Sequence, residues 1–135
     1  MRLKNKVAIV TGGAKGLGRA FALRMAEEGA AVMVVTRKDM ENLKRTADTI
    51  RSMGGEARFF QADVAKIEDT LAMAKATKEA FGRIDILINN AAIYDGIKRT
   101  PFHEIDLSEW DLVMNVNVKG AFLSTRAVFP YMKEQ

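Results

Sequence analysis

The 135-residue sequence contains no cysteine and no long run of apolar residues. Without cysteine, disulfides and thiolate metal sites are excluded, and nothing argues for secretion into an oxidising compartment. The apolar run from Val7 to Thr11 is too short for a signal-peptide core or a membrane span. We therefore expect a cytoplasmic protein without membrane association, and we assign no residue to a metal site.

The sequence also lacks a block of charge of one sign, although its formal net charge is +4. The longest purely basic runs are pairs such as Arg37-Lys38 and Lys98-Arg99, and acidic residues are interspersed among the bases. Because nucleic-acid binding requires a clustered basic face, this pattern argues against a nucleic-acid partner. The excess of positive charge suits an anionic small molecule equally well.

At this length the chain has room for one domain, covering residues 1–135. Four short runs rich in β-branched and apolar residues predict strands at Val7–Thr11, Ala31–Val35, Ala57–Phe60 and Ile84–Ile88. The first, second and fourth runs are almost continuously apolar, as in strands buried on both faces of a parallel sheet. The third is more polar, which predicts an edge strand.

The stretches between these runs carry apolar residues at three- and four-residue steps, which is typical of helices. The predicted core faces are Leu17, Phe21 and Met25, then Met40, Leu43, Ala47 and Ile50, then Ile67, Leu71, Ala74 and Phe81. Glycines at 29, 54–55 and 82 end these helices. Alternating strands and helices predict an α/β fold with a doubly wound parallel sheet in three layers, of Rossmann type.

A fourth and longer helix is predicted from Ser108, whose spacing to Asp111 matches a capping box. Its apolar residues cover more than one face and include Trp110, Val113, Met114, Val118, Phe122, Val128, Phe129 and Met132. One side would cover the sheet, and the other would be covered by a second copy of the chain or by further polypeptide. We expect the complete protein to be a homo-oligomer, a dimer or a tetramer.

A glycine-rich loop from Gly12 to Gly18 follows the first predicted strand and opens the first helix. Glycines at 12, 16 and 18 permit a tight turn and let a ligand approach the backbone N–H groups of the helix N-terminus. The G-x-x-x-G-x-G spacing differs from the common G-x-G-x-x-G fingerprint and from a P-loop. Its place between a buried strand and a helix predicts binding of a dinucleotide diphosphate; a merely tight turn is the alternative.

The end of the second predicted strand indicates which dinucleotide binds. A carboxylate at this point binds the ribose 2′-hydroxyl of NAD, whereas a cation accepts the 2′-phosphate of NADP. Here Thr36 stands in the place of the acid, Arg37 and Lys38 follow it, and Lys15 in the glycine loop can reach the same pocket. We therefore predict NADP in preference to NAD. Asp39 weakens this positive charge, and a solvated turn is the alternative interpretation of the basic pair.

Four motifs make the sequence resemble the short-chain dehydrogenase/reductase family over essentially its whole length. They are Thr11-Gly12 with Gly16-Leu17-Gly18, then Asp63-Val64, then Asn89-Asn90-Ala91-Ala92, then Trp110 to Asn117 and Gly120. In the family, the acid after the third strand receives the adenine amino group, and the asparagine motif stabilises the sheet beside the cofactor. The resulting candidate cofactor residues are Gly12, Ala14, Lys15, Gly16, Leu17, Gly18, Arg37, Asp63, Val64, Asn90, Ala91 and Ala92.

The resemblance also implies a catalytic role for Asn117, because the family uses an asparagine at a helix kink to hold a water in its proton relay. Asn115 is the competing candidate, but the spacing to the flanking motif residues favours Asn117. Two positions depart from the family pattern. Ala92 replaces a glycine and adds a methyl group near the cofactor, and Ala65 replaces a Ser or Thr cap, at a cost of about 1 kcal/mol.

The serine, tyrosine and lysine that act on the carbonyl in this family lie on a fifth strand and the next helix, beyond residue 135. Tyr94 and Lys98 have the tyrosine–lysine spacing but fall in a predicted loop, and Tyr131 belongs to the preceding helix. His103 is expected to be a loop residue near a substrate cleft. We expect a chain truncated after the fourth strand and following helix, with an open sheet edge, marginal stability and no turnover by itself.

The resemblance implies an NAD(P)-dependent oxidoreductase that interconverts a ketone and a secondary alcohol by hydride transfer. The related activities are those of 3-oxoacyl reductases and alcohol dehydrogenases, and the substrate is a small-molecule carbonyl compound or alcohol. A non-catalytic dinucleotide-binding fragment or regulatory module is the alternative, because the same glycine loop serves both.

Overall fold

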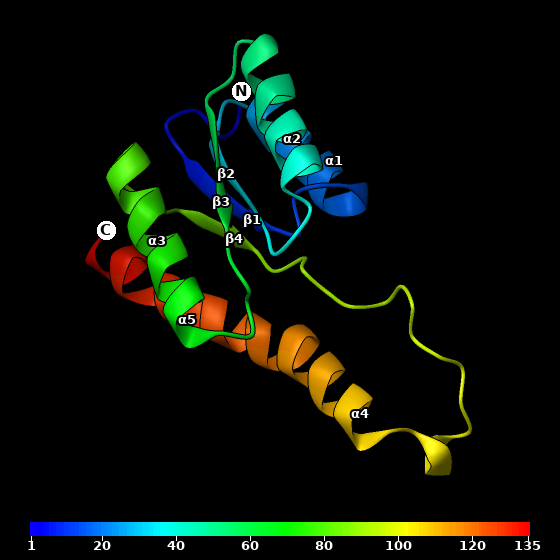
Figure 1. The fold of residues 1–135 in the computed structure, drawn as a ribbon. Coiled ribbons are helices and arrows are strands. Elements are labelled where there is room, and N and C mark those ends of the chain that lie inside the picture. Colours follow the sequence, from blue (N-terminus) through cyan, green and yellow to red (C-terminus); the bar gives the residue numbers. More distant parts are fainter.

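The computed structural model describes residues 1–135 and shows a parallel four-stranded sheet with helices on both faces (Figure 1). The strands are β1 (Val7–Thr11), β2 (Ala31–Thr36), β3 (Ala57–Gln61) and β4 (Ile86–Ile88), in the order β3-β2-β1-β4. Val10 in β1 pairs with Val34 on one side and with Ile88 on the other. This register brings the carboxyl ends of β1, β2 and β4 together at the same end of the sheet.

Burial follows the position of each strand in the sheet. Every residue of β1 is buried, and so are the residues of β2 between its two ends. The third strand lies at an edge, as its polarity predicts, and exposes Arg58 and Phe59. The fourth strand is shorter than predicted and only half-buried, because it forms the other edge. The prediction that it is buried on both faces is therefore wrong for this chain.

Helices cover the two faces in pairs. They are α1 (Gly16–Glu27) and α2 (Met40–Ser52) on one face, and α3 (Ile67–Phe81) and α5 (Gly120–Glu134) on the other (Figure 1). One core, which includes Val34 and Leu43, lies between the first pair and the sheet. The other core includes Met73 and Val128. The predicted doubly wound, three-layer α/β fold is confirmed.

The predicted core face is confirmed for α2 and only in part for α1 and α3, where Met25, Ala74 and Phe81 pack against the cores. The buried residues are Gly18, Ala22 and Ala26 in α1, and Thr70, Met73, Ala74 and Thr77 in α3. The predicted residues Leu17, Phe21, Ile67 and Leu71 are exposed. Small and medium side chains let these two helices lie close to the sheet, and dense packing at that distance has no room for the larger ones.

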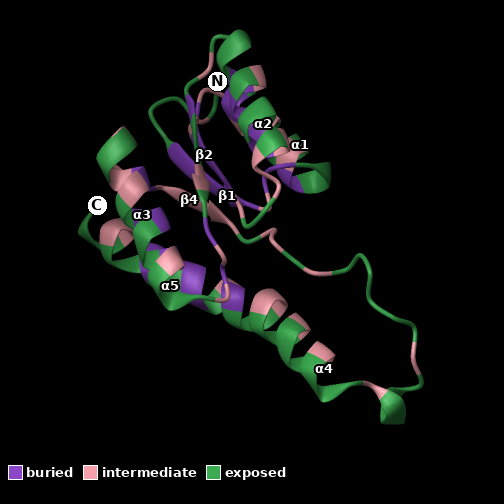
Figure 2. Ribbon diagram, in the orientation of Figure 1, coloured by how far each residue is buried: buried purple, intermediate pink, exposed green.

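The last predicted helix is one rod that contains a π-helical turn. Here α4 (Leu107–Met114) continues through a π-helical segment (Asn115–Lys119) into α5. The N-cap is Asp106, whose carboxylate accepts a hydrogen bond from the N–H of Ser108 at 3.0 Å, so the predicted cap at Ser108 is wrong. The fourth helix buries no residue and, with the loop and 3₁₀ turn (Phe102–Glu104) before it, stands away from the sheet (Figures 1 and 2). No helix combines the length and apolarity needed to span a bilayer.

Candidate functional site

A cleft of about 340 Å³ opens at the carboxyl ends of the strands. Ten of the predicted cofactor residues line it: Gly12, Ala14, Lys15, Leu17, Arg37, Asp63, Val64, Asn90, Ala91 and Ala92. Gly16, Gly18 and Asn117 do not line it. The lining residues that the sequence analysis did not assign are Val35, Thr36, Lys38, Asp39, Ala62, Ile93, Tyr94 and Val116. Each lies within two residues of an assigned residue, and Val116 directly precedes Asn117, which is the signal that could have found them.

Two glycines shape the loop between β1 and α1. Gly12 has a φ of +67°, a backbone conformation that glycine adopts without strain. Gly18 lies so close to it that a β-carbon at position 18 would overlap the carbonyl oxygen of Gly12 and lie 2.5 Å from the Asn90 side-chain nitrogen. A larger residue at position 18 would therefore push the helix away from the loop.

The N-terminus of α1 lies at the cleft, since Ala14, Lys15 and Leu17 line it. Lys15 is the N-cap residue, no side chain caps the helix, and its first turn holds no acid. The N–H groups of Gly16, Leu17 and Gly18 donate no hydrogen bond to another group of the protein. Free N–H groups at the positive end of a helix dipole form a binding site for an anion such as a diphosphate.

Two side chains join the glycine loop to the end of β4. The Asn90 Nδ2 donates to the carbonyl oxygens of Thr11 at 3.1 Å and of Gly12 at 3.2 Å. The Thr11 hydroxyl donates to the carbonyl of Ile88 at 3.2 Å and accepts from the N–H groups of Asn90 and Ala91 at 3.1 and 3.0 Å. These bonds hold the loop and the segment after β4 together as one wall of the cleft.

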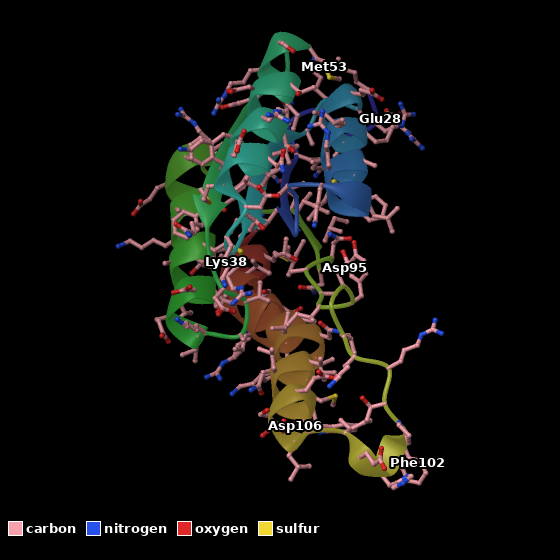
Figure 3. The ribbon with its side chains drawn as sticks, turned by 45° about the vertical axis from the view of Figure 1, so that its right-hand side comes forward. Glu28, Lys38, Met53, Asp95, Phe102 and Asp106 are labelled. Carbon is pink, nitrogen blue, oxygen red and sulfur yellow. The ribbon has the colours of Figure 1, made fainter.

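A basic wall, made by Lys15, Arg37 and Lys38, lies on the side of the cleft where β2 ends. None of these three side chains forms an ion pair within the protein. The Gln61 Nε2 donates to the carbonyl oxygen of Arg37 at 2.9 Å and so fixes the backbone at this point. Lys38 precedes α2 and lies at the end of that helix remote from Met53 (Figure 3). The basic wall is therefore available to a ligand with negative charge.

Asp39 adds an acid to the cleft, but α2 engages its carboxylate. Its Oδ2 accepts from the Asn42 side-chain amide at 2.8 Å, and its Oδ1 accepts from the Asn42 N–H at 3.3 Å. The side-chain hydrogen bond from Asn42 is the main cause of a lowered pKa at Asp39, and the charges of Lys15 and Arg45 lower it further. The Asp39 carboxylate is therefore ionised at neutral pH and serves as the N-cap of the helix.

The end of β3 supplies Asp63 and Val64 to the cleft. Asp63 Oδ1 accepts from the N–H of Ala65 at 2.9 Å, and the Asp63 N–H donates to Asp69 Oδ2 at 2.8 Å. No side chain caps α3, and its N-cap residue is Lys66, so the predicted cap position at Ala65 is wrong by one residue. Val64 packs directly on Gly120, where an added β-carbon would lie 2.6 Å from the Val64 Cγ2. The helical rod thus supports this wall of the cleft.

Asn117 lies in the π-helical segment and pairs with the backbone of Ile93. Its Oδ1 accepts from the Ile93 N–H at 2.7 Å, and its Nδ2 donates to the Ile93 carbonyl at 2.9 Å. The side chain of Asn115 is exposed and makes no hydrogen bond. Asn117 therefore fixes the segment that carries Ile93 and Tyr94 along the cleft.

The other residues weighed for catalysis occupy different places. Tyr94 lines the cleft but is 70% exposed. Tyr131 is partly buried against the second core. His103 lies in the 3₁₀ turn beside the ring of Phe102 and is not part of the cleft. The structure brings none of these side chains together as a catalytic pair.

Comparison with known proteins shows which family this sequence resembles. The model of the short chain dehydrogenase family matches residues 6–135. The dehydrogenase subunit BbsD of Thauera aromatica is 42% identical over 99% of this chain and 52% of its own length. The glucose 1-dehydrogenase 2 of Bacillus subtilis is 38% identical over 96% and 50%. The chain thus spans about half the length of these two curated relatives. It covers 14% of a peroxisomal hydratase-dehydrogenase-epimerase of Neurospora crassa, at 42% identity.

Solved structures share the fold as well. A NAD+-bound xylitol dehydrogenase superposes with a TM-score of 0.93 at 34% identity, over all of this chain and 51% of its own. A double mutant of a Serratia marcescens short-chain dehydrogenase/reductase superposes with a TM-score of 0.92 at 30% identity, over 98% and 53%. Since the family model covers nearly the whole sequence and these structures share its fold, the chain belongs to the short chain dehydrogenase family.

Proposed function

We propose that the chain forms the dinucleotide-binding part of an NAD(P)-dependent oxidoreductase, which interconverts a ketone and a secondary alcohol by hydride transfer. The observation that carries this proposal is the uncapped N-terminus of α1 at the cleft, next to Gly12 and Gly18. A diphosphate fits this point, because the free N–H groups of the helix N-terminus meet it there.

The fold of a solved relative and the residues around the cleft support a dinucleotide at this site. The NAD+-bound xylitol dehydrogenase has the same fold over the whole of this chain. The glycine loop would hold the diphosphate, the end of β2 the adenine ribose, and Asp63 and Val64 the adenine. When bound, the nicotinamide ring supplies or accepts the hydride. Residues of this chain bind and orient the dinucleotide.

We propose NADP in preference to NAD, on the strength of the basic wall. Lys15, Arg37 and Lys38 line the cleft without ion-pair partners of their own. A 2′-phosphate is dianionic, and charge-assisted hydrogen bonds to arginine are strong. Asp39 is the opposing charge, and its carboxylate is engaged by Asn42.

Within this chain, Asn117 is the residue that we assign to the proton relay of the complete protein. Both polar atoms of its side chain are engaged by Ile93. The Asn117 side chain therefore serves the relay by fixing the segment beside the cleft. A serine, a tyrosine and a lysine of the complete protein would act on the carbonyl. We propose that the complete protein is a homo-oligomer in which the exposed apolar residues of the helical rod are covered.

Binding of the two reduced dinucleotides tests the proposal. We expect the protein to bind NADPH more tightly than NADH in a fluorescence titration. Replacing Arg37 by alanine should weaken NADPH binding about tenfold and leave NADH nearly unchanged, because it removes a charge-assisted bond of roughly 1.4 kcal/mol. The matched control is Arg99→Ala, a basic residue outside the cleft, which should change neither affinity.

Failure of the wild-type protein to bind either dinucleotide would overturn the proposal. Turnover separates the enzyme from a non-catalytic dinucleotide-binding module. The complete protein should oxidise NADPH in the presence of ketones, whereas a binding module would bind NADPH without consuming it.

A further inference from the structure

We propose that Asn42 is a specificity-determining residue, which favours NADP by holding the Asp39 carboxylate on the N-terminus of α2 and away from the basic wall. The inference rests on the proposed function, in which Lys15, Arg37 and Lys38 receive the 2′-phosphate. Asn42 itself does not line the cleft. Its effect is therefore exerted through Asp39.

Asp39 stands where it can oppose the basic wall. It directly follows Arg37 and Lys38 in the sequence and lines the same cleft. A carboxylate near the end of the second strand of a dinucleotide fold can accept hydrogen bonds from the adenine ribose, and it repels a 2′-phosphate. An Asp39 side chain free to turn toward the cleft would thus favour NAD over NADP.

Asn42 prevents this turn with two hydrogen bonds to the carboxylate. Its side-chain Nδ2 lies 2.8 Å from Asp39 Oδ2, and its backbone N–H lies 3.3 Å from Asp39 Oδ1. Both carboxylate oxygens are therefore engaged on the helix. The shorter of the two bonds comes from the side chain, so substitution can remove it and leave the backbone bond in place.

Neighbouring residues orient the Asn42 amide for this purpose. Its Oδ1 accepts from the Arg45 Nη1 at 3.4 Å, which directs the amide nitrogen to Asp39. The carbonyl oxygen of Asn42 accepts from the hydroxyl of Thr46, a fully buried side chain, at 3.1 Å. The Arg45 contact thus orients the donor to Asp39, and the Thr46 contact holds the backbone that carries it.

Three variants separate this role from a structural one. Asn42→Ala removes the amide and keeps the helix, because alanine is the best helix former. Asp39→Asn removes the charge and keeps an N-cap, because asparagine caps a helix as well as aspartate does. The third variant combines both substitutions. The measured quantity is the ratio of the dissociation constants for NADH and NADPH, from fluorescence titrations at one salt concentration.

We expect Asn42→Ala to lower this ratio about threefold and Asp39→Asn to raise it about threefold, the size of effect typical of partly exposed charges. In the Asp39→Asn background, Asn42→Ala should leave the ratio unchanged, because no carboxylate remains to be released. Simple destabilisation of α2 would weaken both dinucleotides alike and would not depend on the charge of residue 39. Should Asn42→Ala not fold, Asn42→Leu gives the same readout.

An unchanged ratio in Asn42→Ala would overturn the inference, and so would an equal change in the presence and absence of the Asp39 charge. These results differ from failure of the proposed function, in which wild-type protein binds neither dinucleotide. The predicted direction also holds if the wild-type protein prefers NADH, because the variants report the shift of the ratio and not its starting value.

Discussion

The side-chain amide of Asn117 pairs with both backbone polar groups of Ile93, at 2.7 and 2.9 Å. Gln135 makes the same arrangement with Ile84, at 3.1 and 2.8 Å. Two side-chain amides of one helical rod therefore bond to backbone groups before and after β4. This strand lies at an edge of the sheet, where no neighbouring strand satisfies those groups. These pairs hold the rod across the strand that ends at the cleft.

Replacing Asn117 by alanine should lower the free energy of unfolding by about 1–3 kcal/mol, because the half-buried N–H and carbonyl of Ile93 lose their partners. Urea denaturation at neutral pH measures the change. The control is Asn115→Ala in the same π-helical segment, whose side chain has no partner, with an expected change below about 0.5 kcal/mol. Similar losses in the two variants would contradict the assigned role of Asn117.

Replacing Gly18 by alanine should weaken dinucleotide binding more than tenfold, roughly 1.4 kcal/mol or more, because the added β-carbon collides with the carbonyl of Gly12. Gly82→Ala is the matched control. Its φ of +80° strains any alanine, at about 1–2 kcal/mol of stability, yet its surroundings are open. Titration with NADPH of both folded variants distinguishes them. Normal binding by Gly18→Ala would show that the loop geometry is not needed for the ligand.

Stability in acid should depend on Glu28 near the N-terminus. Hydrogen bonds from Arg2, first from its side chain and then from its backbone, lower the pKa of Glu28 from 4.5 to about 2. Because the folded pKa lies below the unfolded one, the stabilisation is complete above about pH 4.5 and is lost as the pH falls toward 2.

The measurement is the melting temperature of wild-type protein and Glu28→Gln as a function of pH. We expect the wild type to melt higher at neutral pH, and the difference to shrink steadily below pH 4.5. A difference that stays constant down to pH 3 would be at odds with the Arg2 contact. Arg2→Ala should reproduce most of the pH dependence of Glu28→Gln, and the remainder comes from the ion pair of Arg24 with Glu28 at 2.7 Å.

The helical rod exposes large apolar side chains, and Figure 2 shows α4 as exposed or intermediate along its length. Phe122 and Phe129 are 61% and 58% exposed. If a second copy of the chain covers this surface in the complete protein, Phe122→Glu with Phe129→Glu should lower the oligomer mass in sedimentation experiments. Phe102→Glu, outside the rod, should leave the mass unchanged. A monomeric wild-type protein would rule out the proposed oligomer.

The sequence predicted the sheet and the cleft because both depend on local patterns. Continuous apolar, β-branched runs predicted the burial of β1 and β2, and the polarity of Arg58 predicted an edge strand, whereas a similar run wrongly predicted a buried β4. The glycine loop is recognisable because Gly12 and Gly18 meet a backbone requirement that other residues cannot satisfy. Most residues that line the cleft lie in the glycine loop or directly after a strand in the sequence.

What the sequence did not predict depends on contacts between distant residues. The buried faces of α1 and α3 are set by how closely each helix approaches the sheet, so Ala22 and Thr77 are buried although Leu17 and Leu71 are more apolar. The pairing of Asn117 with Ile93 joins residues that no local pattern links. The π-helical turn that permits it shifts the helical period by one residue, which periodicity over a short stretch does not resolve.

Amide NMR spectra recorded during a titration with NADPH test most directly whether the glycine loop holds a dinucleotide. We expect the backbone signals of Gly16, Leu17 and Gly18 to shift most, together with those of residues 36–39. NADPH binding that leaves these signals in place and shifts those near Glu28 and Met53, which lie far from Lys38 in Figure 3, would contradict the proposed site.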